Sequence, residues 1–290
     1  MNGRLLRVTA AVALSLVLAL SISGNLDAMN WPCDNAVLTR NFGSNDRGNP
    51  VLGMVFSGDT EVLAAEKGEV IFSRAKNDTV SRLPSPLGSW TALDHGDGLI
   101  SIYSRYADED RAFTQVEKSQ PIARTGISGW SDQRGFYFVV YDRRERRWIN
   151  PAMLITPSRE SRPPQIVSVE LRDAQGLSML SRSLTQGRYT VQVNAIIPSV
   201  VRGSLLAPQR ILCSINGAEA GSLNLEAVSA RDGVLMVSRN GLVPAKQVYA
   251  AFPAFETAEI FLSRGQATLE IIVQDIDGNS RSSVSRLFVN

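Results

Sequence analysis

The stretch W-T-A-L-D-H-G-D-G-L-I-S-I-Y-S-R-Y, Trp90 to Tyr106, decides the fold of the first half of this chain. Two segments with strand character flank the turn-forming residues Asp94 to Gly98, which predicts a β-hairpin. Side chains alternate along a strand, so Tyr103 and Arg105 are expected on the same face of the second strand. His95, in the turn, is the only histidine in the sequence.

Length and composition describe an ordinary globular chain with room for two domains. The chain has 290 residues, of which 44% are hydrophobic and 20% are charged, so it can bury sizeable cores. The net charge of +2 and the pI near 8.6 are too mild for nucleic-acid binding, which needs a concentrated basic face. Short alternating runs separated by Gly, Pro, Asn and Asp, without a long helical period, predict an all-β fold.

The first 28 residues have the features of a signal peptide. Arg4 and Arg7 precede an apolar run from Val8 to Ile22, and small and polar residues follow up to Ala28. The apolar run is shorter than the ~20 residues that span a bilayer. We therefore expect an exported protein of the periplasm or cell envelope, with no membrane span after signal cleavage.

Changes in composition divide the chain into four segments. We expect the signal peptide at 1–28, a β domain at 29–156, a polar, proline-bearing linker at 157–164 and a second β domain at 165–290. The last segment ends in two strands around an Asp-Gly-Asn turn, as in many immunoglobulin-like β-sandwiches. The stretch Val228 to Phe261 is less regular and is expected to hold a short helix. The clearest expected strands are Val62–Ala65, Val70–Ser73, Trp90–Leu93, Leu99–Tyr103 and Phe136–Tyr141 in the first domain, and Gln165–Arg172, Arg188–Ile196, Arg210–Asn216, Ala267–Asp275 and Ser282–Val289 in the second.

The two cysteines are expected to be unpaired. An exported protein permits a disulfide, but Cys33 and Cys213 fall in different expected domains. Cys213 also alternates with Ile211 and Ile215 on one strand face, as a small buried hydrophobic residue would. Neither cysteine has a neighbouring histidine that would make it a nucleophile.

Five motifs, in order along the first domain, connect this chain with a known family. They are W-P-x-x-N-x-V-L-T-R-N-F-G at Trp31–Gly43, D-T-E-V-L-A-A-E-K-G-E-V at Asp59–Val70, D-H-G-D-G-L-I-S-I-Y at Asp94–Tyr103, Q-P-I-A-R-T-G-I-S-G at Gln120–Gly129, and Phe136–Val140 followed by Asn150-Pro151. Each motif is weak alone, but together they resemble the lysostaphin-type (LytM-like) zinc endopeptidases, which cut peptidoglycan cross-bridges. The resemblance covers nearly half of the chain and implies a LytM-like β domain.

The resemblance also implies a zinc site, and its residues are replaced in this chain. The zinc ligands of the family correspond to Val51, Val55 and Tyr137, and its two further histidines correspond to Arg105 and Gly135. Zinc binds imidazole nitrogen and carboxylate oxygen and keeps one position open for water. Aliphatic side chains offer no such atoms, so we expect no metal, no cofactor and no catalytic residue.

The surviving histidine, His95, is expected to bond nearby backbone in its turn. A serine hydrolase built on His95 is the alternative, but the sequence contains no nucleophile-elbow motif such as G-x-S-x-G.

The leading hypothesis is a catalytically inactive LytM-like envelope protein. Its former substrate groove would bind a cell-wall hydrolase or another envelope protein and regulate peptidoglycan hydrolysis, as amidase activators of this family do. Tyr103, Arg105 and Tyr137 are the candidate groove residues, in a cleft made apolar and aromatic. The alternatives are a non-catalytic peptidoglycan-binding or scaffold protein and, less favoured, a zinc endopeptidase acting on peptidoglycan.

Overall fold

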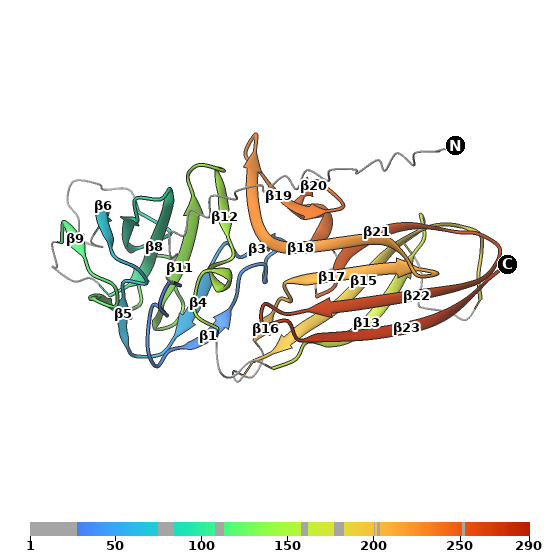
Figure 1. Ribbon diagram of the computed structural model, residues 1–290, viewed down its shortest axis with the longest axis horizontal. Coiled ribbons are helices and arrows are strands. Elements are labelled where there is room, and N and C mark those ends of the chain that lie inside the picture. Colours follow the sequence, from blue (N-terminus) through green and yellow to red (C-terminus); the bar gives the residue numbers. More distant parts are fainter. Residues whose placement is uncertain are drawn as a thin grey trace, which may run out of the picture.

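β-strands make up most of the chain, as the sequence predicts (Figure 1). The computed structural model describes residues 28–74, 84–107, 113–157, 162–176, 183–199, 201, 204–250 and 253–290. The expected signal peptide therefore lies outside the described residues, apart from its last position. Within the described ranges, no helix has the length and apolar character needed to cross a bilayer.

The N-terminal lobe is built on one antiparallel sheet with the order β12-β11-β8-β7-β6-β9, and β4 also pairs with β11 and β1. A 3-10 turn at Pro151–Met153 closes this lobe. Its strands are β1 (Val37–Arg40), β2 (Asn45–Asp46), β3 (Asn49–Pro50), β4 (Met54–Ser57), β5 (Glu61–Leu63), β6 (Gly68–Arg74), β7 (Ser89–Asp94), β8 (Leu99–Tyr106), β9 (Gln115–Val116), β10 (Pro121–Arg124), β11 (Gly135–Asp142) and β12 (Arg147–Ile149).

The predicted hairpin is confirmed as β7 and β8, which pair in antiparallel register. Two aspartates shape its turn: Asp94 accepts the Gly96 N–H and Asp97 accepts the Leu99 N–H, both at 2.9 Å. Aspartate side chains commonly stabilise turns by bonding the backbone two residues further on. The turn is therefore encoded by its own residues.

One face of this sheet packs a hydrophobic core. Tyr103 of β8 and Phe138 of β11 are both fully buried there, with ring centroids 5.1 Å apart. Phe56 of β4 stacks on Phe136 of β11 at 4.9 Å. Because side chains alternate along a strand, Tyr137, between Phe136 and Phe138, lies on the opposite face of β11.

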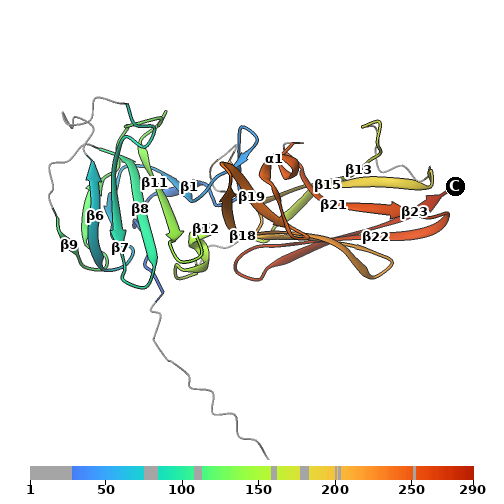
Figure 2. The same cartoon turned by 90° about the horizontal axis from the view of Figure 1, so that it is seen from above.

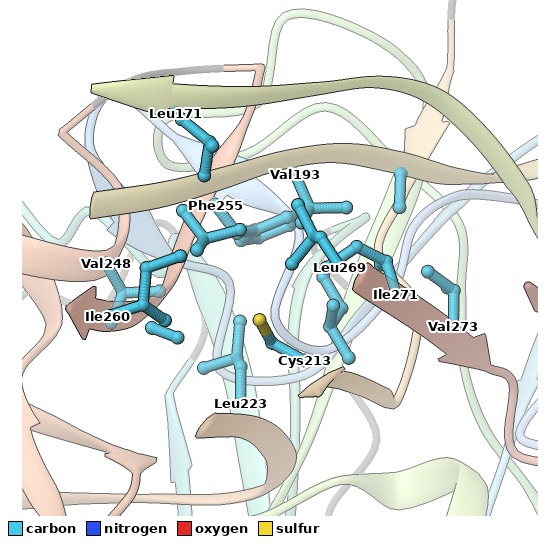
Figure 3. Close-up of a cluster of buried hydrophobic side chains, with 14 of the residues drawn as sticks. Leu171, Val193, Cys213, Leu223, Val248, Phe255, Ile260, Leu269, Ile271 and Val273 are labelled. Carbon is cyan, nitrogen blue, oxygen red and sulfur yellow. The ribbon is translucent and has the colours of Figure 1, made fainter. Parts of the chain in front are cut away.

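The C-terminal lobe is a two-layer β-sandwich. One layer contains β13, β15 and β21, and the other has the order β23-β22-β17-β18, which is consistent with the immunoglobulin-like sandwich that the sequence predicts. Side chains of the two layers meet in the core, among them Leu171, Val193, Cys213 and Leu223 (Figure 3). The elements are β13 (Gln165–Arg172), β14 (Ser183–Leu184), β15 (Gly187–Pro198), β16 (Leu205–Leu206), β17 (Arg210–Ile215), β18 (Ala218–Arg231), β19 (Val234–Arg239), β20 (Leu242–Pro244), α1 (Ala245–Val248), β21 (Phe255–Leu262), β22 (Gly265–Gln274) and β23 (Ser280–Val289).

The stretch expected to be irregular, Val228 to Phe261, is more ordered than its sequence indicates. Its short helix is confirmed as α1, but the end of β18 together with β19, β20 and most of β21 fills much of the rest. The strand β18 runs well past the sandwich, where β19 pairs with it. This extension still contributes Val228, and β19 contributes Val237, to the core of the C-terminal lobe.

A backbone ladder joins the two lobes, which lie end to end (Figures 1 and 2). Strand β12 pairs with β18, with Trp148 opposite Val228, and the Asn150 N–H donates to the Glu226 carbonyl at 2.8 Å. Phe42, from the N-terminal lobe, is buried in the C-terminal core. The lobes therefore share both a sheet and part of a core.

Both cysteines are unpaired, as predicted. Cys33 and Cys213 lie in different cores, and burial raises the pKa of each thiol to about 12. A thiol with so high a pKa stays protonated near neutral pH and is a poor nucleophile.

Candidate binding groove

Tyr137 of β11 is the centre of the candidate site. Its Cα partners are Val55 on β4 and Ser104 on β8, so the three residues are neighbours across adjacent strands. The Tyr137 hydroxyl accepts a hydrogen bond from the Leu52 N–H at 3.0 Å. This bond fixes the direction of the ring.

Arg105 of β8 lies against the same tyrosine. Its guanidinium carbon is 5.0 Å from the Tyr137 ring centroid, within the range of a cation–π contact. Its backbone has φ +67°, in the left-handed region that side-chain-bearing residues seldom adopt, and its N–H donates to the Leu87 carbonyl at 2.8 Å. This conformation turns Arg105 out of the regular alternation of β8.

Tyr103 does not line the groove, so the prediction for this residue is wrong. The prediction that Tyr103 and Arg105 share a strand face is wrong as well. Tyr103 is fully buried in the core, where its hydroxyl accepts the Ala65 N–H at 2.7 Å. The alternation rule assumes a regular strand, and the left-handed backbone at Arg105 breaks it. Tyr103 is therefore a core residue that anchors the hairpin and is not accessible to a partner.

The other two predicted positions, Val51 and Gly135, lie next to this centre. Val51 is buried, and its backbone bonds Gly43 and Ser44 just before Leu52 reaches Tyr137. At Gly135, an added Cβ would lie 2.0 Å from the Phe56 carbonyl oxygen. No side chain fits at position 135 without movement of the backbone.

A cleft of about 270 Å³ opens beside Val55 and Arg105. Trp130, on the rim of this cleft, is 78% exposed. Its backbone N–H donates to the Pro86 carbonyl at 3.0 Å. The cleft is lined by Arg40, Asp46, Arg47, Val55, Phe56, Arg105, Trp130, Ser131, Asp132, Gln133 and Phe136. We call this set the groove.

Sequence reasoning missed Trp130 and the arginines of the β1–β3 region. An exposed tryptophan directly after the glycine-bearing motif that ends at Gly129 is the signal that would have pointed to it, since large exposed aromatic residues are enriched at binding surfaces. Arg40 and Arg47 carry no such signal, because only the fold places them beside β8.

Comparison with known proteins identifies this part of the chain. Residues 51–151 match the model of peptidase family M23. This part of the N-terminal lobe is therefore similar to the peptidases of family M23. A second family model matches residues 163–290. An uncharacterized protein of Treponema pallidum (strain Nichols) is 26% identical over 138 residues, which are 42% of this chain and 92% of that protein.

Solved structures with partial similarity to this chain include M23 proteins. The catalytic domain of a prophage-encoded M23 protein, EnpA, from Enterococcus faecalis is 19% identical, covers 42% of this chain and 94% of its own, and has a TM-score of 0.36. A chain of the SpoIIQ–SpoIIIAH pore-forming complex is 17% identical, covers 45% of this chain and 92% of its own, and has a TM-score of 0.37. The solution structure of lysostaphin is 14% identical, covers 90% of this chain and 96% of its own, and has a TM-score of 0.36. The similarity to family M23 rests on the sequence match of residues 51–151.

The family implies zinc, and the side chains at the positions that the resemblance assigns do not fit it. Val51 and Val55 have no donor atoms. Burial raises the pKa of Tyr137 to about 12, so its phenol stays neutral at ordinary pH and is a poor metal ligand. Within the described ranges, no group of three or more His, Cys, Asp or Glu residues is placed to hold a metal ion.

His95 bonds its surroundings in the N-terminal lobe, as predicted for a turn histidine. Its Nδ1 lies 2.7 Å from the Lys67 carbonyl oxygen and its Nε2 lies 2.9 Å from the Ser101 hydroxyl. The Ser101 hydroxyl in turn lies 3.3 Å from that of Tyr103. Both ring nitrogens are thus engaged in holding the turn against the core.

Proposed function

We propose that this chain is a catalytically inactive, LytM-like envelope protein whose groove binds a protein partner and thereby regulates peptidoglycan hydrolysis, in the manner of an amidase activator. The partner is a cell-wall hydrolase or another envelope protein. The chain acts after export, in the periplasm or cell envelope. Peptidoglycan itself is the competing ligand.

The contact of Arg105 with Tyr137 carries this proposal. At positions that the resemblance assigns to the metal and catalytic histidines, Arg105 lies over the Tyr137 ring, and Tyr137 pairs with Val55 on the next strand. The exposed ring of Trp130 adds apolar surface at the rim. Clefts that combine apolar walls with a few fixed polar groups are suited to binding.

The direct test measures amidase activity on purified sacculi with and without the mature protein. We expect activation that falls about tenfold in Arg105→Glu and in Trp130→Ala. Arg281→Glu is the matched control, because Arg281 is exposed on β23 of the other lobe and makes the same change of charge. Circular dichroism shows whether each variant is folded.

Two results would contradict the proposal. Stoichiometric zinc together with cleavage of cross-linked peptide would make the protein a peptidase. Sedimentation of the protein with sacculi, with amidase rates unchanged, would make it a wall-binding protein.

A further inference from the structure

We propose, on the basis of this proposed function, that the groove recognises an extended acidic segment of its protein partner, with a carboxylate of that segment bound by Arg105. The chemistry follows from the state of three side chains: Arg105, Tyr137 and Trp130.

The Arg105 guanidinium has unused hydrogen-bonding capacity. Its Nε is buried and has no hydrogen-bond partner, and no Asp or Glu in the described part of the chain forms an ion pair with it. Leaving a buried N–H unpaired is unfavourable, so a ligand that supplies an acceptor there is favoured. A neutral apolar ligand would leave this cost in place.

The guanidinium is also held in position before any ligand arrives. The Tyr137 ring lies beneath it, and the Leu52 N–H fixes that ring through the hydroxyl. Arginine presents a planar fork of donors that matches the two oxygens of a carboxylate. Because the fork is oriented in advance, little side-chain freedom is lost on binding.

The charges around Arg105 favour an anion. The groove is lined by three arginines and two aspartates. Asp46 is already paired with Arg40 at 3.2 Å, which leaves Arg47, Arg105 and Asp132. Their sum is one positive charge. A partner with a carboxylate therefore fits the groove better than a basic partner.

The rim indicates a polypeptide segment. Trp130 is largely exposed beside the buried Phe136 and the half-buried Val55, and polar side chains of Ser131 and Gln133 lie on the same loop. A segment that places an apolar residue on Trp130 and an acidic residue on Arg105 would use both features. Aromatic residues and arginine are the types most often found at the energetic centre of protein interfaces.

The test presents an array of random hexapeptides to the full mature protein. We expect peptides bound by the wild type to be enriched at least fivefold in Asp or Glu at one position. Arg105→Asn should lose this enrichment, and asparagine suits the test because it tolerates left-handed backbone. Arg105→Lys, which keeps the charge and loses the fork, should bind the selected peptides about tenfold more weakly than the wild type.

A second measurement does not depend on any variant. Affinity of the wild type for a selected acidic peptide should fall when NaCl is raised from about 50 to 500 mM, because salt screens a partly exposed ion pair. Affinity for the same peptide with amides in place of its acids should be weak at both salt concentrations.

The outcomes separate this inference from the proposed function. Binders that depend on Trp130 but show no acidic preference would overturn the inference and leave the proposed groove standing. An acidic preference retained in Arg105→Asn would also overturn it. Displacement of the selected peptides by soluble peptidoglycan fragments, dependent on Arg105, would assign the carboxylate to wall polymer and overturn a protein ligand. The absence of any Trp130-dependent binder would count against both.

Discussion

The hydroxyl of Tyr249 donates a 2.6 Å hydrogen bond to the carbonyl oxygen of Gly43, and this buried bond joins the two lobes. Gly43 in turn donates its N–H to the Val51 carbonyl, and the next residue, Leu52, donates to the Tyr137 hydroxyl. A side chain of the C-terminal lobe is thus linked through backbone to the ring beneath Arg105. The C-terminal lobe is therefore connected, through these bonds, to the ring on which Arg105 lies.

Removing this hydroxyl should weaken the whole molecule. Tyr249→Phe leaves the buried Gly43 carbonyl without this donor, so we expect the free energy of unfolding to fall by about 1–3 kcal/mol, measured by urea titration. Tyr189→Phe is the matched control, since its hydroxyl bonds the Thr185 carbonyl at 2.8 Å within one lobe. Lower affinity for the selected peptide in Tyr249→Phe alone would show the link to the groove. Equal stability of the wild type and Tyr249→Phe would contradict a structural role for the bond.

Position 135 should reject even a methyl group. In Gly135→Ala the new Cβ would meet the Phe56 carbonyl oxygen, so strands β4 and β11 must separate, at a cost of about 1–3 kcal/mol or more. Gly187→Ala is the control, because an added Cβ there meets nothing within 4 Å. We expect that control to change stability by less than about 0.5 kcal/mol. Similar thermal unfolding curves for the two variants would show that the strands yield easily.

Chelation should leave the fold unchanged. The positions that the resemblance assigns to zinc ligands carry two valines and a neutral tyrosine, so we expect EDTA to find no structural ion to remove there. We expect the Tm to stay within error after dialysis against EDTA, and to stay the same when zinc is added back. A fall in Tm that zinc reverses would show that metal supports the fold.

Stability should decline as the pH rises above 9. Burial raises the pKa of both thiols, at Cys33 and Cys213, from 9.0 to about 12, so the folded state holds protons that the unfolded state releases. Their contribution is fully present below pH 9 and is lost as the pH rises toward 12. The double variant Cys33→Ala/Cys213→Ala should be less stable at pH 7 but lose less stability between pH 9 and 10 than the wild type. The free energy of unfolding is measured by urea titration at each pH. If it falls equally steeply with pH in the wild type and in the double variant, the thiols are not the cause of the decline.

The elements that could be predicted from sequence are those with a local cause. The β7–β8 hairpin follows from alternating strands and from two aspartates that bond their own turn, and the burial of Cys213 follows from its place between two isoleucines. The resemblance to the M23 family likewise rested on short motifs, each read in place.

The features that sequence missed depend on contacts between distant segments or on one unusual backbone angle. No local pattern marks the left-handed conformation of Arg105, which separated it from Tyr103. The pairing of β12 with β18 joins residues that lie about 80 positions apart in the sequence, such as Trp148 and Val228, so no local pattern marks it. Trp130 becomes a groove residue only because its loop is tied to Pro86.

The sheet shared by the two lobes fixes the distance between the groove and the far end of the C-terminal lobe. Because β12 pairs with β18, and β18 also pairs with β17 in the sandwich, the groove lies at a fixed distance from the far ends of β22 and β23 (Figure 2). A partner bound to those far strands would therefore hold the groove at a fixed distance and in a fixed orientation relative to itself. Shortening β18 would therefore change where the protein can act without touching a single residue of the groove.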